Sequence, residues 1–318
     1  MPAFGYPSLT LANKNVLSNM MKQVFLSKKL IALVVFWVLW GGLNPAWSQF
    51  RTSFKVGLNV ARMAGPSEEG PDGAPLETWR NTTSFLLGLG FGYSLTDAFG
   101  LRGELIYSRR GAKYTFDGPS YRLFRHSAGV TEARGQSRYF INIQNTYIDL
   151  PVLAYGRWKD FEFSAGVYGG LLVQSIGEGS LLFANGRTVP LGNAVDDLEF
   201  NLQHNYRKDK IGGGDFNEKV IAQVDARRVE MPKTMGAYYD YPEGSGKLYQ
   251  TLDYGLLGGV SYYLSRSLFF SVRFQYGLAD ITNEKGDLAK AQTDNGNLIF
   301  RNDRDHNVLW QFALGFGF

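Results

Sequence analysis

The sequence contains no cysteine, only three histidines among its 318 residues, and no acidic residue before Gln49. The absence of cysteine excludes disulfide bonds, Cys-ligated zinc, iron–sulfur clusters and thiol nucleophiles. His126, His204 and His306 are far apart in the chain, and no two have the spacing of a metal-ligand pair. We therefore expect neither a metal site nor a bound cofactor.

Apart from its first 48 residues, the chain also lacks an excess of either charge. Four lysines before Gln49 account for the net charge of +4, and the remaining 29 basic residues balance 29 acidic ones. A nucleic-acid partner, which a pI near 9.0 would otherwise suggest, is therefore not expected. After Gln49 no apolar run approaches the roughly 20 residues that a membrane-spanning helix needs.

The first 48 residues have the pattern of targeting sequence. From Met21 a short basic stretch is followed by an apolar run over residues 30–40, and small side chains (Ala46, Ser48) precede Gln49. A basic region, a short apolar region and a small-residue cleavage site are typical of a secretory signal peptide. The predicted organisation is upstream sequence from an early assigned start at 1–20, a signal peptide at 21–48 and a mature chain at 49–318.

What the mature chain has in abundance is glycine, with 38 residues in all, and aromatic residues, which make up 15% of the sequence. Bulky apolar residues alternate with small or polar ones, which puts successive side chains on opposite faces of a strand. Eight such runs occur, at 54–61, 85–94, 101–108, 147–154, 161–171, 252–262, 270–278 and 307–318.

The connections between these runs alternate in length. Tight turns are predicted at 96–98, 157–160 and 265–267, and long polar loops at 63–81, 113–139, 176–250 and 282–305. Short turns on one side and long loops on the other are the plan of an outer-membrane barrel with both termini in the periplasm. The predicted fold is all-β: an eight-stranded antiparallel transmembrane β-barrel with long extracellular loops.

A soluble barrel of the lipocalin kind is the alternative, and it requires an apolar interior. Side-chain size favours the membrane barrel, because the bulky face fits lipid and the small face fits the narrow interior of eight strands. Aromatic residues such as Tyr93 and Phe99 also lie beside the short turns, as an interfacial girdle requires.

Charged residues occupy several positions of the inward face: Lys55, Arg102, Glu104, Asp149, Asp253 and Arg273. Buried charges must be paired and hydrogen-bonded, so these residues are predicted to form an ion-pair network that fixes strand register. A proton or ion pathway is the functional alternative. Because side chains fill an eight-stranded interior, a general porin is not expected.

The last run places four aromatic side chains on one face: Trp310, Phe312, Phe316 and Phe318. A terminal aromatic residue on an amphipathic strand resembles the signal that barrel-assembly machinery reads, and the last strand must also pair with the first to close the barrel. We predict roles in assembly and closure, with simple interfacial anchoring of Phe318 as the alternative.

The connection at 176–250 is far longer than an ordinary loop and carries too much apolar content for pure disorder. We expect a partly ordered outer cap that contacts a partner or folds over the barrel. Within it, a short helix is predicted at 218–229, and 238–249 is predicted to extend the following strand.

Several segments, in order and in phase with the strands, carry a family resemblance: 104–108 with Gly111, 147–151, 165–170, 253–256 and 273–281. The chain resembles the PorT-like outer-membrane β-barrel domain of the Bacteroidota. The resemblance implies a cell-envelope protein that crosses the membrane as a barrel.

Two functions remain open. The leading hypothesis is a non-porin surface scaffold, or a component of an envelope complex, that sits in outer-membrane lipid and binds an envelope protein through its long loops. The alternative is a lipid-modifying hydrolase at the outer rim, to which His306 could contribute. No spacing selects a catalytic residue, so enzyme activity is not expected.

Overall fold

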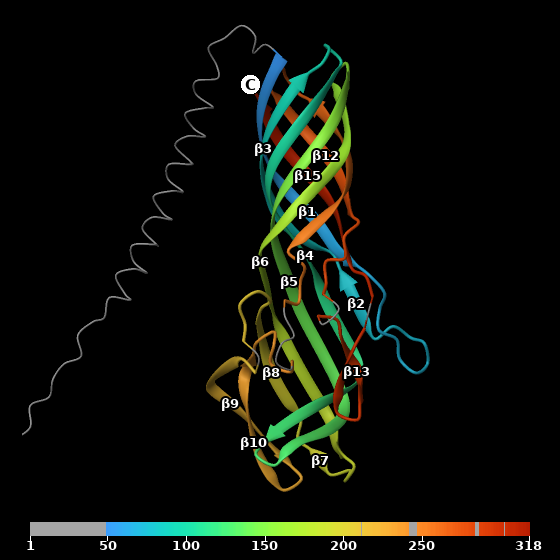
Figure 1. Cartoon of the computed structure of the whole chain (residues 1–318), viewed down its shortest axis with the longest axis vertical. Coiled ribbons are helices and arrows are strands. Elements are labelled where there is room, and N and C mark those ends of the chain that lie inside the picture. Colours follow the sequence, from blue (N-terminus) through green and yellow to red (C-terminus); the bar gives the residue numbers. More distant parts are fainter. Residues whose placement is uncertain (1–48, 211, 242–246, 284–285, 302) are drawn as a thin grey trace, which may run out of the picture. The chain divides into compact units, whose positions relative to one another are not determined.

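Eight strands form a ring in which each strand is hydrogen-bonded to two neighbours, in the order β1-β3-β4-β5-β6-β11-β12-β15 and back to β1 (Figure 1). This computed structural model describes residues 49–318 except 211, 242–246, 284–285 and 302, so the targeting sequence predicted at 1–48 lies outside the described residues. The ring strands are β1 (Phe50–Ala64), β3 (Thr82–Ser94), β4 (Phe99–His126), β5 (Gly129–Trp158), β6 (Phe161–Val189), β11 (Leu252–Tyr263), β12 (Leu268–Gly277) and β15 (His306–Gly317).

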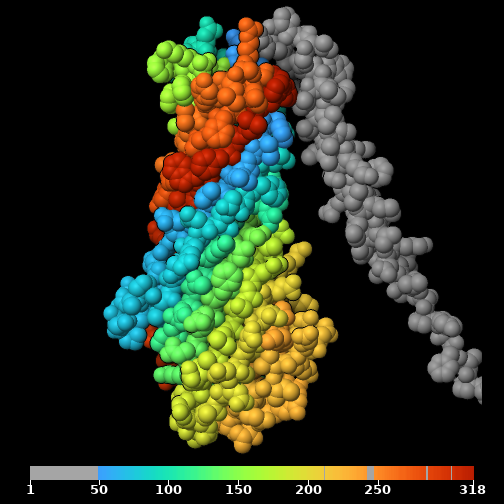
Figure 2. Space-filling view, turned by 180° about the vertical axis from the view of Figure 1, so that it is seen from behind, coloured from blue at the N-terminus to red at the C-terminus, as the bar shows by residue number. Residues whose placement is uncertain are grey.

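All eight predicted runs are therefore confirmed as ring strands. The ring closes where β1 meets β15, with Leu58 opposite Phe312 and Val60 opposite Trp310. Figure 2 shows β15, in red, lying beside β1, in blue. No helix in the described part of the chain is long and apolar enough to cross a membrane.

The two faces of the ring differ as the alternating pattern predicts. Outward side chains near the short turns are large, apolar and exposed, such as Leu58 at 53% and Phe163 at 53%. Inward side chains at the same level are polar and buried, such as Lys55 and Glu104, both at 6%. This arrangement is the reverse of a lipocalin-like barrel, whose interior is apolar.

Three ring strands continue well past the others. β4 and β5 pair in a single register until His126 meets Gly129 at a two-residue turn. Where β3 stops, β2 (Glu77–Arg80) pairs with β4, and where β11 stops, β8 (Leu198–Asn205) pairs with β6. We call the distal parts of β4, β5 and β6, with the smaller strands around them, the extended half.

The smaller strands complete the extended half. A sheet continues from β8 through β10 (Arg227–Met235) to β9 (Gly214–Val224), and β7 (Ala194–Val195) pairs with β6. β13 (Leu288–Asp294) and β14 (Asn297–Phe300) form a separate hairpin. These strands lie at the lower end of Figure 1, with the short turns at the other end.

The polarity of the strand faces is exchanged in the extended half. On β4 the inward residues Phe116 and Phe124 are fully buried in an apolar core, whereas the outward Lys113 and Asp117 are exposed. The same strand thus keeps its period of two while its outer face changes from apolar to polar. This is the pattern expected of a strand whose surroundings change from lipid to water.

The structure corrects the loop predicted at 113–139. That segment is the distal part of β4 and β5, because its alternation continues with reversed polarity. The connections at 63–81 and 282–305 likewise contain β2 and the β13–β14 hairpin.

Two predictions inside 176–250 are wrong. The helix predicted at 218–229 is instead the β9–β10 hairpin, since Ala222 and Val224 alternate with exposed neighbours and the turn residues Asp225 and Ala226 both have positive φ. In the described part of 238–249 there is no strand extension; Tyr238 turns inward, donating a hydrogen bond from its hydroxyl to the Tyr206 carbonyl.

Candidate functional site

Three charge clusters occupy the interior of the ring, which we call the bore. In the first, the Glu104 carboxylate on β4 accepts hydrogen bonds from Lys55 Nζ at 2.7 Å and from Arg273 Nη1 and Nη2 at 2.7 and 3.0 Å. Lys55 comes from β1 and Arg273 from β12, so the cluster ties opposite walls of the bore together. The three side chains are only 3–8% exposed.

The second cluster lies near the short turns and is centred on Glu162 of β6. Arg102 Nη2 lies 2.6 Å from Glu162 Oε1, and Arg157 Nε donates to Glu162 Oε2 at 2.9 Å. The Tyr263 hydroxyl adds a further hydrogen bond to Glu162 at 3.1 Å.

In the third cluster, Arg110 lies between two carboxylates, with Nη2 2.8 Å from Asp149 Oδ1 and 3.3 Å from Asp253 Oδ2. Its guanidinium stacks 3.8 Å from the centroid of the Tyr147 ring. Inward glycine makes the room: a Cβ on Gly170 would overlap the Asp149 carboxylate and come within 3.0 Å of Arg110 Nη2.

The six residues predicted to form one bore network are thus all inside the ring, but in separate groups. Lys55, Glu104 and Arg273 meet; Arg102 meets Glu162; Asp149 and Asp253 share Arg110. Arg110 and Glu162 were missed. The sequence pattern could have identified both, because each lies at an inward-facing position of the alternation along its strand.

The four aromatic residues of the last strand point outward. Trp310, Phe312 and Phe316 are 48%, 38% and 49% exposed, and Phe318 is 71% exposed just beyond the strand. They follow the apolar band of the ring. Their role in assembly stays a prediction.

The extended half contains a cavity of about 160 Å³ that the sequence did not predict. Its lining includes Trp79 from β2 and seven tyrosines, which come from β4, from β5, from position 206 just after β8 and from the connection around 235–249. Trp79 and Tyr114 pack with ring centroids 4.7 Å apart, and Tyr206 and Tyr249 pack edge to face at 5.1 Å. The wall therefore includes several packed aromatic rings.

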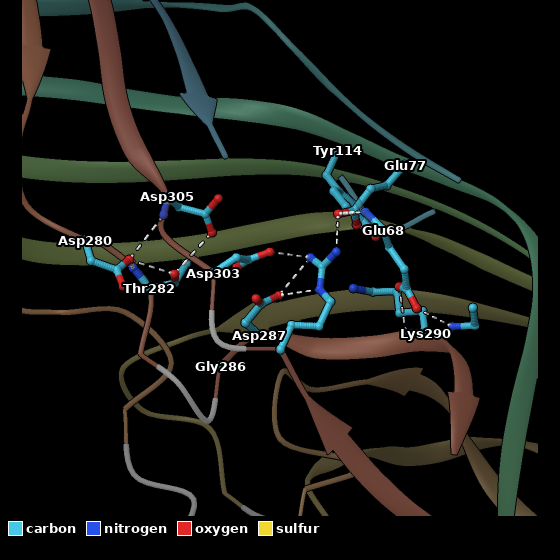
Figure 3. A network of polar contacts seen from close by, with 12 residues as sticks. Glu68, Glu77, Tyr114, Asp280, Thr282, Gly286, Asp287, Lys290, Asp303 and Asp305 are labelled. Carbon is cyan, nitrogen blue, oxygen red and sulfur yellow. Dashed lines mark hydrogen bonds and ion pairs between the residues drawn. The ribbon is translucent and has the colours of Figure 1, made fainter. Parts of the chain in front are cut away.

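Ion pairs frame the cavity. Arg122, only 4% exposed, lies 3.1 Å from Asp240 Oδ2. Arg301 joins three acidic side chains: Nη1 lies 2.9 Å from Glu77, and Nη2 lies 2.9 Å from Asp287 and 3.5 Å from Asp303 (Figure 3).

The β13–β14 hairpin closes one side of the cavity. The Glu68 carboxylate accepts the backbone N–H groups of Lys290 and Ala291, both at 2.9 Å, and Figure 3 shows Glu68 beside Lys290. The Tyr121 hydroxyl donates to the Ala289 carbonyl at 3.1 Å. The Lys290 ammonium lies 4.7 Å from the centroid of the Tyr114 ring.

Burial shifts the pKa values of several groups around the cavity. It raises the pKa of Asp303 to about 8, assisted by the hydrogen-bonded Asp287 carboxyl, and raises the pKa of Asp305 to about 6. It lowers the pKa of His204 to about 4, so this imidazole is neutral at pH 7. It raises the pKa of Tyr114, so this hydroxyl stays protonated.

Each of the three histidines has a hydrogen-bond contact within the protein. His126 Nε2 contacts the Thr131 hydroxyl, His204 Nδ1 contacts the Tyr206 hydroxyl, and His306 Nδ1 lies 3.0 Å from the Ala279 carbonyl. Within the described residues, no group of three or more His, Asp or Glu is arranged to hold a metal ion.

A ring that is apolar outside and charged inside defines a transmembrane β-barrel. The family model described as "Outer membrane protein beta-barrel domain" matches residues 44–283, and the chain belongs to that family. The barrel therefore sits in the lipid of the outer membrane.

Among the solved structures that match this chain are three small outer-membrane proteins. Ail of Yersinia pestis is 9% identical with a TM-score of 0.34, covering 85% of this chain and 99% of Ail. Neisserial surface protein A is 11% identical with a TM-score of 0.32, covering 85% and 97%. OprG of Pseudomonas aeruginosa is 12% identical with a TM-score of 0.29, covering 84% and 95%. A comparison with curated proteins gave no match.

Proposed function

We propose that this protein is a non-porin outer-membrane barrel that serves as a surface scaffold for an envelope protein. The observation that carries the proposal is the extended half, which has an apolar core of its own and an outer face suited to water. Membrane anchoring alone needs only the ring strands within the apolar band. The bore clusters support a closed barrel rather than a channel.

The proposed orientation has the short turns and both termini in the periplasm and the extended half outside the cell. It rests on the usual plan of bacterial barrels, with short periplasmic turns and long extracellular connections. The absence of native cysteine allows a direct test. Ala128→Cys at the β4–β5 turn should react with a membrane-impermeant maleimide on intact cells, whereas Asp97→Cys at a short turn should react only after lysis. The opposite labelling would overturn this orientation.

The proposed partner surface is β9. Among the described strands it pairs only with β10, so one row of its backbone groups is free to pair with another chain. Phe216 and Ile221 on this strand are 47% and 45% exposed. An edge with two apolar anchors fits a protein partner that adds a strand.

Photo-crosslinking in cells tests this surface. A photoreactive residue at Phe216 or Ile221 should give one stoichiometric adduct, and the double variant Phe216→Glu/Ile221→Glu should lose the co-purifying protein. Val130, 57% exposed elsewhere in the extended half, is the matched control and should give no adduct. Equal crosslinking from all three positions, or none from β9, would refute the scaffold role of this edge.

Finer assignments are also proposals. We place the chain with the PorT-like barrels of the Bacteroidota on the segments quoted above, and we infer that the barrel-assembly machinery recognises the last strand through Phe318. The lipid-modifying hydrolase gains no support, because His306 hydrogen-bonds a backbone carbonyl.

A further inference from the structure

The cavity in the extended half has the size of a ligand site. Protein interiors contain few voids larger than a water molecule, and a cavity of about 150 Å³ holds a benzene molecule. At about 160 Å³ this cavity matches a ligand with a single six-membered ring. Small-molecule sites are typically lined by aromatic side chains with a few convergent polar groups, as here.

The aromatic wall offers flat apolar faces. Trp79, Tyr114 and Tyr139 come from three different strands and line one cavity. A ring with an apolar face can stack on such side chains and bury that face at little conformational cost, since aromatic side chains have few torsions to fix.

The charges in the wall are nearly all compensated within the protein. Arg122 pairs with Asp240, and Arg301 pairs with Glu77 and Asp287. A ligand with a full charge would have to break these pairs or remain uncompensated in a buried site, which is costly. Taken together, the lining has three cations (Arg122, Lys290 and Arg301) and four carboxyl groups (Glu77, Asp240, Asp287 and Asp305), so it offers no net positive charge to an anion. The wall therefore favours a neutral ligand.

Two polar groups keep unused hydrogen-bonding capacity. Asp240 Oδ1 is buried and has no hydrogen-bond partner. The Lys290 ammonium contacts the rings of Tyr114 and Tyr139, and no carboxylate of the described residues lies within salt-bridge distance of it. One group accepts hydrogen bonds and the other donates them. A hydroxyl can do both, so a ligand bearing several hydroxyls satisfies the two groups together.

We propose that this cavity binds one neutral sugar residue in its six-membered ring form, with the ring face against the aromatic wall and hydroxyls on Asp240 and Lys290. The sugar can be a free monosaccharide or the terminal residue of a glycan. This site is separate from the β9 edge and does not depend on a protein partner.

The test uses the mature protein in a detergent without a sugar headgroup. Glucose, galactose, mannose and N-acetylglucosamine are titrated by calorimetry and by tryptophan fluorescence, with phenol as a ring of similar size that lacks the hydroxyl pattern. We expect saturable binding of at least one sugar, and a fluorescence change that disappears in Trp79→Phe. Methyl glycosides and short oligosaccharides form a second arm: binding equal to the free sugar identifies a terminal residue, and its loss identifies a free monosaccharide.

The variants separate the cavity from the surface. Lys290→Met and Asp240→Asn should each weaken binding about tenfold or more, roughly the loss of one strong hydrogen bond. Lys113→Met and Asp117→Asn make the same chemical changes on the outer face of β4 and should bind as wild type does. Lys290→Met keeps the hairpin anchored, because that anchor uses only backbone atoms of Lys290. The proposal is overturned if no sugar binds below about 10 mM, if phenol binds more tightly than every sugar, or if Lys290→Met and Lys113→Met bind equally.

Discussion

The bore cluster around Glu104 allows a stability prediction with a matched control. Glu104→Gln keeps the size and shape of the side chain but removes the negative charge that Lys55 and Arg273 share. The amide can still accept one hydrogen bond, whereas two cations at 2.7 Å now lack a counter-charge. Both cations are almost completely buried, so water cannot replace the carboxylate.

Breaking a buried ion pair by removing one partner costs about 3–5 kcal/mol. The control is Glu230→Gln, which makes the same change in the exposed Lys219–Glu230 pair, where both side chains are more than 40% exposed. An exposed pair contributes about 0–1 kcal/mol. With a denaturant dependence of ~2 kcal/mol per M of urea, the unfolding midpoint should fall by about 2 M for Glu104→Gln and by less than about 0.5 M for Glu230→Gln.

The assay is reversible urea unfolding in lipid vesicles, followed by tryptophan fluorescence and by the mobility of unheated samples in gels. A triple replacement of Lys55, Glu104 and Arg273 by apolar residues of similar volume should recover most of the lost stability, since no unpaired charge remains. If Glu104→Gln and Glu230→Gln have midpoints within about 0.5 M of each other, the reasoning about the bore is wrong.

Three further outcomes are expected. Phe318→Asp should lower the yield of heat-modifiable protein in membrane fractions, because it puts a charge at the lipid interface and removes the terminal aromatic residue. The control, Val130→Asp, should not lower this yield. Equal yields for Phe318→Asp and wild type would remove the assembly role. Protein reconstituted in planar bilayers should give no stable open-channel conductance, and a steady open level would contradict the filled bore. The raised pKa of Asp303 means that the folded state holds this proton more tightly than the unfolded chain, so its stabilising effect is complete below about pH 4 and is lost as the pH rises through about 8. Hydrogen exchange in the β13–β14 hairpin should therefore speed up between pH 6 and 9 in wild type more than in Asp303→Asn, and identical profiles would show that Asp303 is not the titrating group.

The ring could be predicted from the sequence because two constraints act on every residue of it. Lipid requires a bulky apolar outer face, and the narrow bore requires small or paired polar residues inside, so each strand shows a strict period of two. The extended half obeys the same period with the polarity reversed. A search for outward apolar residues therefore stops near Lys113, and the rest of β4 looks like a loop.

Local signals in the extended half were present but unused. Asn295-Gly296, both with positive φ, form the β13–β14 turn, and Asn-Gly is a strong hairpin signal. Ending the third run at Ser108 also hid Arg110, which lies two residues further along the same face. The cavity, by contrast, has no local sequence signal. Trp79, Tyr206 and Lys290 are distant in sequence, and only the three-dimensional packing of the extended half brings them to one wall.

The pairing of β4 with β5 in a single register, from the short-turn end to the turn after His126, also has a mechanical consequence. Antiparallel hydrogen bonds run perpendicular to the strands, so a pull on that distal turn along the strand direction draws β4 and β5 together and loads in shear the hydrogen bonds that join β4 to β3 and β5 to β6. They would have to break together, whereas a sideways pull would open them one at a time. The strand pair is therefore stiff along its length, and tension applied at the tip would be carried down to the ring held in the bilayer.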